Sequence, residues 1–421
     1  MPSSAGSMPP PTSFAITECR ICASPRLELV VDLGDQPLAN SLRRDRAEVL
    51  PVFPLRICRC AACGTIQLTE TIAPEKLFEH YVWVTGTSEG ARLYSRLFFD
   101  RMVERAPHRR LFVVEVASND GTFLKPFLAH GDRVLGVDPA RNIAAMAEAA
   151  GVPTVAEFFG LEVARRIVKR EGRADCVFAR NVIPHVANAN DVVAGMAYCL
   201  SDEGVGAIEF HRADVILEQL HYDSVYHEHL YFHSLHSIRR LLARSGLVPF
   251  DVTTSPISGG SFVVYFAKGS RPATAAYASA LQDEEALGIG EAGPWREFAR
   301  RCERHRLLLR SLVEEKKAEG KRIVGYGASA RSSTMLNYCG IDHRLLDVVI
   351  DRSPLKHNTY TPGTDIPIVA PADAFALNPD VILLLAWNFR DEILAQIKAE
   401  YGWTGQVIVP LPGDPAVVDL V

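Results

Sequence analysis

The sequence predicts a mixed α/β protein of three parts: a small cysteine-rich module at the N-terminus, followed by two Rossmann-like α/β domains. Five of the nine cysteines fall within the first 63 residues. Apolar strands then alternate with helical patterns twice, from about residue 85 to 200 and again after residue 321. Such alternation is typical of parallel sheets covered by helices. The length of 421 residues also exceeds that of one ordinary domain.

The composition is that of a folded protein without a dominant surface charge. Hydrophobic residues make up 48% and charged residues 23% of the chain. The net charge is −5, so we expect no nucleic-acid partner, and no apolar run reaches the roughly 20 residues of a membrane span. Residues 1–17 lack charged side chains and the pattern of a signal peptide, which predicts a disordered leader on a cytoplasmic protein. We expect a monomer or a weak homo-oligomer.

Two Cys-x2-Cys pairs mark the first part of the chain. They are Cys19 with Cys22 and Cys60 with Cys63, and 37 residues separate the pairs. Each short turn directs two thiolates at one ion, and four thiolates complete the tetrahedral shell of a structural zinc. Cys58 is an alternative ligand because it lies two residues from Cys60. The other interpretation of the cluster is a set of buried free thiols.

The first α/β pattern contains a strand, Leu111–Val116, that runs into a turn with a single glycine. A dinucleotide-binding turn needs three glycines so that the backbone approaches a pyrophosphate closely. S-adenosylmethionine has no phosphate, so this requirement relaxes, and the acid at the end of the next strand, Arg133–Val137, can bind ribose hydroxyls. A further strand, Asp175–Ala179, would line the same crevice. An ordinary turn without ligand is the alternative. The residues predicted to contact the cofactor are Glu115, Ala117, Asn119, Gly121, Asp138 and Asn181.

Histidine and tyrosine are concentrated in one short segment. Five of thirteen histidines lie between His221 and His236, and its centre is the run Tyr226–His229, Tyr-His-Glu-His. A zinc-protease motif is excluded because the position four residues after the first histidine of this run is Tyr231. On an extended segment the tyrosine and glutamate share one face and the two histidines the other. Histidine can abstract a proton, glutamate can orient it and tyrosine can stabilise an oxyanion. We therefore predict catalysis at this run.

A charged helical segment over residues 294–320 leads to the second α/β pattern. There Ile323–Ala330 fits G-x-G-x-x-A after a strand, and Asp351 closes the next strand. This arrangement predicts a phosphate-binding helix N-terminus with Ser329, Arg331 and Ser332 as added donors. It would hold NAD or a nucleotide diphosphate, or it is a turn without ligand.

Taken in order, these motifs resemble the S-adenosylmethionine-dependent nucleotide-sugar C-methyltransferases, notably the sugar 3-C-methyltransferases of branched deoxysugar biosynthesis. The resemblance spans nearly the whole chain. It rests on the four paired cysteines and on the runs Val31–Asn40, Tyr81–Ser88, Glu115–Gly121, Asp223–His229, Ser258–Ser261, Gly325–Gly340 and Tyr360–Ile368. It implies a zinc-binding module at 18–80, a class I methyltransferase domain at 81–270 and a C-terminal Rossmann-like domain for the nucleotide sugar at 271–421.

The resemblance also implies the reaction. S-adenosylmethionine would donate a methyl group to a dTDP-linked 4-keto-deoxysugar, at C3 beside the ketone, while Zn²⁺ would be structural. It implies that His229 is the base, with Tyr226, Glu228 and Tyr81 beside it. Contacts to the nucleotide sugar are expected from Ser329, Arg331, Ser332, Asn337, Lys356 and Tyr360.

Three alternatives stay open on the sequence. The second glycine loop would also serve an NAD-dependent oxidoreductase acting on a nucleotide sugar. An O- or N-methyltransferase would use the same donor site. A non-catalytic zinc-containing binding protein would keep the fold without turnover, although the Tyr-His-Glu-His run argues against it.

Overall fold

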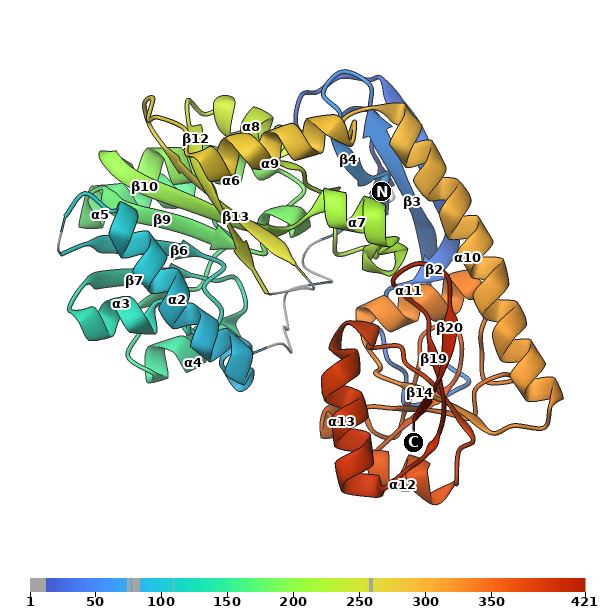
Figure 1. Cartoon of the computed structure of the whole chain (residues 1–421). Helices are drawn as coiled ribbons and strands as arrows, with labels where there is room; N and C mark the ends of the chain where they lie inside the picture. Colours follow the sequence, from blue (N-terminus) through green and yellow to red (C-terminus); the bar gives the residue numbers. More distant parts are fainter. Residues whose placement is uncertain (1–12, 74–76, 78–83, 109, 257–259, 421) are drawn as a thin grey trace, which may run out of the picture.

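The computed structural model describes residues 13–73, 77, 84–108, 110–256 and 260–420. Two α/β domains lie at opposite sides of the molecule, and the N-terminal module lies between them beside the long helix α10 (Ala292–Ala318) (Figure 1). Among the described residues, every helix is too short or too polar to cross a lipid bilayer. The predicted fold class is confirmed.

The N-terminal module is built on an antiparallel sheet that the central domain completes. Its own strands are β2 (Leu27–Pro37), β3 (Val52–Cys60) and β4 (Ile66–Leu68). The fourth strand is β11 (Tyr231–Phe232), which pairs with β4 and lies just after the histidine-rich run. The module therefore reaches directly into the segment predicted to be catalytic.

Ordered structure begins before the residue at which we expected the N-terminal leader to end. Ser13–Ala15 forms β1 and pairs with β5 (Glu70–Ile72). The prediction of a disordered leader over residues 1–17 is thus wrong for these three residues, because backbone hydrogen bonds to β5 hold them in place. Residues 1–12 lie outside the described ranges.

The central sheet has seven strands in the order β12-β13-β10-β9-β6-β7-β8. β6 to β10 are mutually parallel, whereas β12 and β13 run antiparallel to their neighbours. Their bounds are β6 Phe112–Val116, β7 Arg133–Val137, β8 Thr154–Val155, β9 Ala174–Arg180, β10 Leu200–His211, β12 Val248–Ser255 and β13 Ser261–Ala267. The strand order reverses between β6 and β9, and a crevice for ligands forms at such a point beyond the carboxyl ends of the strands.

Helices cover both faces of this sheet because its strands are apolar on both sides. Side chains of α2 (Glu89–Arg105) and α3 (Lys125–His130) pack on the face that contains Val113, whereas those of α5 (Leu161–Glu171) and α6 (Ala189–Cys199) pack on the face that contains Val114. Successive strand residues point to opposite faces, so burial on both sides requires a mostly apolar strand, and β6 is apolar except for the buried Glu115. The remaining helices of the domain are α4 (Arg141–Ala149), α7 (Ala213–Gln219) and α8 (Leu235–Ala243).

The C-terminal sheet also has seven strands, in the order β16-β17-β15-β14-β18-β19-β20. The five inner strands are parallel and the two edge strands antiparallel. The bounds are β14 Ile323–Tyr326, β15 Val348–Ile350, β16 Thr359–Tyr360, β17 Pro367–Val369, β18 Val381–Leu383, β19 Gly405–Val409 and β20 Ala416–Leu420. The helices are α11 (Ala330–Cys339), α12 (Pro371–Ala376) and α13 (Arg390–Tyr401).

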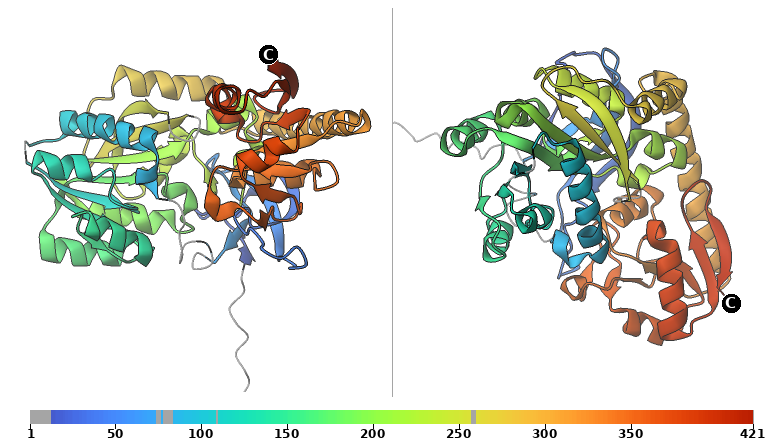
Figure 2. Two further views of the ribbon diagram at one scale, coloured as in Figure 1. Left: turned by 90° about the horizontal axis from the view of Figure 1, so that it is seen from below. Right: turned by 60° about the vertical axis from the view of Figure 1, so that its left-hand side comes forward.

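Helix α10 connects the three parts. It follows α9 (Ala275–Ala286) and contacts β2 of the N-terminal module, α7 of the central domain, and α11 and β14 of the C-terminal domain. Its buried residues, among them Phe298, Cys302, Leu309 and Val313, recur at helical spacing along one side. The N-terminal module contacts both α/β domains, through β2 with α11 and through β4 with β11, and Figure 2 shows it from two further sides.

Candidate active site and zinc centre

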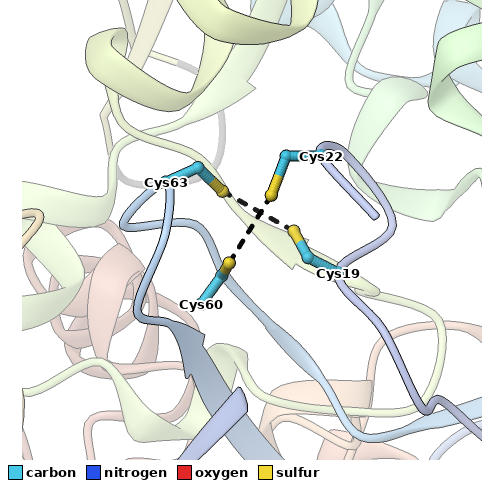
Figure 3. Close-up of side chains that lie close together, drawn as sticks. All are labelled: Cys19, Cys22, Cys60 and Cys63. Carbon is cyan, nitrogen blue, oxygen red and sulfur yellow. Dashed lines mark hydrogen bonds between the residues drawn. The ribbon is translucent and has the colours of Figure 1, made fainter. Parts of the chain in front are cut away.

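The four paired cysteines converge on one point. Sγ of Cys19 lies 3.6 Å from Sγ of Cys63, and Sγ of Cys22 lies 3.6 Å from Sγ of Cys60. All four sulfurs lie within 4.8 Å of one another (Figure 3). Four thiolates about 2.3 Å from one zinc ion would be about 3.8 Å apart. The cluster therefore fits a structural zinc, and Cys58, which lies on β3 outside the cluster, is not needed as a ligand.

The turn after β6 is strained in a way that suits close approach of a ligand. Ala117 and Asn119 have φ angles of 53° and 50°, and Gly121 has one of 73°. A Cβ atom at Gly121 would lie 2.8 Å from Val152, so no other residue fits there. The first segment of the described chain after residue 83 lies against this turn, because the Thr85 N–H donates to Asn119 Oδ1 at 2.8 Å.

The acid of this site stands at the end of β7. Asp138 is buried and accepts hydrogen bonds from the N–H groups of Asn119 and Ala140, each at 2.9 Å. Burial raises its pKa, and the two N–H groups oppose that shift. It forms no ion pair among the residues that the structure describes. The turn and this carboxylate fit the ribose end of S-adenosylmethionine.

Two other predicted cofactor contacts lie around this crevice. Asn181, at the end of β9, has a φ of 50°, and its N–H donates to the Glu209 carbonyl at 2.9 Å. Glu115 is 2% exposed within β6, and burial raises its pKa well above the usual range. Its contact with the cofactor stays a prediction.

The Tyr226–His229 run forms a turn, which corrects the extended conformation that we expected. The N–H of His229 donates to the carbonyl of Tyr226 at 2.9 Å. The turn brings the Tyr226 hydroxyl to 2.8 Å from His229 Nε2, whereas His227 points to the Phe53 carbonyl of the N-terminal module at 3.3 Å. The two histidines therefore do not share a face, because contacts with other parts of the chain shape the segment.

The hydrogen bonds of His229 determine which of its nitrogens can accept a proton. Its Nδ1 lies 2.9 Å from the carbonyl oxygen of Ser224, which only accepts, so Nδ1 carries the hydrogen. Nε2 is then an acceptor, and the Tyr226 hydroxyl donates to it. Burial, with smaller contributions from the neighbouring His185 ring and the Arg331 guanidinium, holds the pKa of His229 well below its usual range, and the bond to the Ser224 carbonyl opposes that shift. The imidazole is therefore neutral near pH 7 and available as a base.

Glu228 does not orient His229, which differs from the role the sequence suggested. Its Oε1 accepts a hydrogen bond from Nδ2 of Asn40 at 2.6 Å. Its carbonyl oxygen lies 2.8 Å from Nδ1 of His185, whose ring stands edge-on to that of His229 at 4.8 Å between centroids. Burial raises the pKa of Glu228, and the bond from Asn40 opposes that shift.

Sequence reasoning missed Asn40 and His185. Asn40 belongs to a run quoted for the family resemblance, but nothing in it indicates a contact 188 residues away. His185 is an isolated histidine in sequence, and burial lowers its pKa to about 4. Only the fold brings these side chains to the turn.

Other members of the histidine cluster have structural roles. His233 is fully buried, stacks on Tyr231 and has its Nδ1 3.0 Å from Ser237 Oγ at the start of α8. His221 packs edge-on against Trp387 of the C-terminal domain. The density of histidines thus reflects packing as well as chemistry.

The polar groups at the second glycine loop form hydrogen bonds with one another and with nearby residues of the same domain. Ser329 and Ser332 cap the N-terminus of α11 reciprocally. Lys356 donates to the carbonyl of Ala328 at 2.6 Å and pairs with Asp351 at 2.9 Å. The helix begins at residue 330, so Ser329 is its N-cap. Donors expected to be open for a phosphate therefore already have partners.

The remaining predicted substrate residues are spread over the same domain. Arg331 is paired with Asp223 of the central domain at 2.8 Å. Asn337 donates to the carbonyl of Pro362 at 3.0 Å, and the Tyr360 backbone pairs with that of Arg43 in the N-terminal module. Tyr81 lies outside the described residues, so its contribution stays a prediction.

Comparisons with known proteins cover all three parts of the chain. A zinc binding domain family matches residues 19–78, a methyltransferase domain family matches residues 89–251, and a family of C-methyltransferase C-terminal domains matches residues 256–412. The chain is 36% identical to the C-methyltransferase NovU of Streptomyces niveus over 411 residues, which are 96% of this chain and 97% of that protein.

Two solved methyltransferase structures match less than half of the chain. Magnesium protoporphyrin IX methyltransferase of Synechocystis PCC 6803, with bound S-adenosylmethionine, is 14% identical with a TM-score of 0.33, over 43% of this chain and 80% of that one. The glycopeptide N-methyltransferase MtfA is 15% identical with a TM-score of 0.34, over 44% and 96%. The full-length similarity to NovU and the three family matches place this chain in the family of S-adenosylmethionine-dependent C-methyltransferases with an N-terminal zinc binding domain.

Proposed function

We propose that the protein methylates C3 of a dTDP-linked 4-keto-deoxysugar. The observation that carries this proposal is the pairing of Tyr226 and His229, in which a neutral imidazole has its basic Nε2 2.8 Å from a hydroxyl. Methylation of carbon requires removal of a C–H proton, and a proton beside a ketone is acidic because its loss gives an enolate. A neutral histidine is the side chain best matched to that step near pH 7.

The proton and electrons have a defined course in this reaction. Nε2 of His229 takes the C3 proton, and the C–H electron pair becomes the enolate with its charge on the C4 oxygen. The Tyr226 hydroxyl, released from Nε2, would donate to that oxygen. When bound, S-adenosylmethionine would supply an electrophilic methyl group on sulfur, which the enolate carbon would accept while the C–S electrons stay on sulfur.

Glu228 would bind a substrate hydroxyl. Asn40 occupies its Oε1, while Oε2 has no hydrogen-bond partner within the described part of the chain. A carboxylate oxygen next to a base is suited to accept a hydrogen bond from a sugar hydroxyl and so to fix the ring. We place the nucleotide against the C-terminal domain, where Lys356 would exchange part of its contact with Asp351 for a phosphate oxygen.

Product analysis tests the substrate. The purified protein is incubated with S-adenosylmethionine and a panel of dTDP-4-keto-sugars, and the products are analysed by mass spectrometry and by carbon NMR. We expect a new C–CH₃ carbon at C3 of one sugar. A methyl group on oxygen or nitrogen would overturn the proposal and favour an O- or N-methyltransferase.

Proton exchange tests the base. In D₂O with S-adenosylhomocysteine in place of the donor, we expect enzyme-dependent deuterium incorporation at C3. His229→Asn should lower exchange and turnover by about 10²–10⁴-fold while S-adenosylhomocysteine still binds. His227→Asn is the matched control, because its Nε2 contacts the Phe53 carbonyl instead of the site, and it should exchange normally. Equal exchange by both variants contradicts the role of His229.

The acidic side of the pH profile reports the same group. Because the folded-state pKa of His229 is lowered, the base stays neutral as pH falls past the ordinary histidine value of about 6.5. Activity should be lost only below that pH. Tyr226→Phe removes a donor that favours the neutral ring, so the loss should move to higher pH. A wild-type profile of kcat/KM that already falls above pH 6.5 would contradict this account.

A further inference from the structure

Within the described ranges, one buried carboxylate of the central domain accepts its side-chain hydrogen bonds from the C-terminal domain alone. Asp223 lies in the short 3-10 helix η3 (Tyr222–Ser224), and its side chain is fully buried. Arg331 of α11 donates to its two oxygens, with Nε 3.0 Å from Oδ2 and Nη2 2.8 Å from Oδ1. Trp387 adds a third bond from Nε1 to Oδ2 at 2.8 Å. We call these three side chains the Asp223 clamp.

The clamp lies next to the group that orients the base. Ser224 follows Asp223 directly, and its carbonyl oxygen accepts the Nδ1 hydrogen of His229 at 2.9 Å. On the other side, Thr334 Oγ1 of α11 donates to the carbonyl of Val225 at 2.8 Å. The same helix therefore holds the residue before and the residue after Ser224, which fixes the direction of the carbonyl between them.

The buried ion pair between Asp223 and Arg331 contributes more to a defined geometry than to the stability of the fold. An ion pair removed from water gains little net stability, because desolvation offsets its attraction. Its geometry is nevertheless well defined, since a guanidinium that bonds two oxygens of one carboxylate allows few orientations. Arg331 also lies over the Trp387 ring, with its Cζ 4.9 Å from the centroid, so both donors pack as one unit.

We propose that Arg331 and Trp387 are positioning residues for the base: by holding Asp223 they fix the Ser224 carbonyl, and with it the Nδ1–H tautomer of His229. This inference rests on the proposed function of His229. It replaces the expectation that Arg331 contacts the nucleotide sugar, because two of its donors already serve Asp223. The C-terminal domain thereby contributes to proton abstraction without touching the substrate carbon.

Trp387→Phe is the most selective test. It removes one hydrogen bond to Asp223 and keeps an aromatic ring beside His221. We expect kcat to fall by about 10-fold with KM for the sugar unchanged, since small misplacement of a reacting group costs up to about 100-fold. Trp403→Phe is the matched control, because Trp403 Nε1 donates to the Pro379 carbonyl at 2.8 Å, within the C-terminal domain. The control should keep wild-type kcat.

Nitrogen NMR of histidine-labelled full-length protein reads the tautomer directly. In the wild type His229 should be in the Nδ1–H form, and in Trp387→Phe and Arg331→Gln a mixture with the Nε2–H form should appear. Arg331→Lys should restore part of the wild-type signal. An unchanged tautomer in Trp387→Phe overturns the inference, as does a rise in sugar KM at constant kcat in Arg331→Lys. If the tautomer shifts in the variants but the wild type shows no exchange at C3, the result contradicts the role of His229 as the base. It still supports the role of the Asp223 clamp in setting the tautomer.

Discussion

The two α/β domains carry similar turns after their first strands, but the turns serve different ends. The turn after β6 has a single glycine of its own, strained backbone at Ala117 and Asn119, and an acid, Asp138, without a cationic partner among the described residues. The turn after β14 matches the dinucleotide pattern, yet its acid, Asp351, is paired with Lys356 at 2.9 Å. A glycine pattern predicts the course of the backbone, whereas the capacity for a ligand depends on which polar groups stay unpaired.

Ligand-induced stabilisation gives the largest expected difference between the two turns. At a concentration 1,000 times its Kd, S-adenosylhomocysteine should stabilise the folded protein by about 4.1 kcal/mol, read as a rise in Tm. NAD at the same concentration should leave Tm unchanged, because Asp351 and the α11 cap are already satisfied. Stabilisation by NAD alone would reverse the comparison and favour an oxidoreductase.

Replacing the acid of each turn by asparagine gives the next largest expected effect. Asp138→Asn removes the charge that we expect to bind the ribose, and hydrogen bonds to charged groups contribute about 1.5–3 kcal/mol. The Kd for S-adenosylhomocysteine, measured by calorimetry, should rise about 10- to 150-fold. Asp351→Asn should lower Tm through the loss of its bond with Lys356 and leave this Kd unchanged. Equal weakening by both variants would contradict the assignment of the donor to the first turn.

Removal of Asn40 should have the smallest effect. Asn40 belongs to the N-terminal module and contacts the site only through one hydrogen bond to Glu228 among the described residues. Asn40→Ala deletes the bond to Glu228. We expect a loss of about 0.5–1.5 kcal/mol of transition-state stabilisation, which lowers kcat/KM by about 2- to 13-fold. Asn190→Ala is the control: its Nδ2 donates to the Arg20 carbonyl at 2.8 Å, also at the N-terminal module but away from Glu228. A greater loss of turnover in the control would show a general effect of module docking.

The sequence predicted the parts of the fold that depend on local pattern. The strand Arg133–Val137 and the four zinc ligands follow from apolar runs and from Cys-x2-Cys spacing, and both are found in place. The partners of the Tyr226–His229 run and of the preceding Asp223 were not predictable, because Asn40 and Arg331 lie 188 and 108 residues from their partners Glu228 and Asp223. The turn at Tyr226–His229 was missed for the same reason, since distant groups hold its flanks.

The pairing of β11 with β4 has a consequence for dividing this protein into working pieces. The sheet of the zinc module receives its last strand from residues 231–232, far beyond the end of the module in sequence. A fragment that ends near residue 73 would expose the unpaired edge of β4, and open edges promote self-association. An exchange of zinc modules between related enzymes would therefore have to carry β11 and the adjoining Tyr226–His229 run as well. In this protein the zinc module and the strand β11 that completes its sheet form one structural unit, so the module alone cannot be transferred.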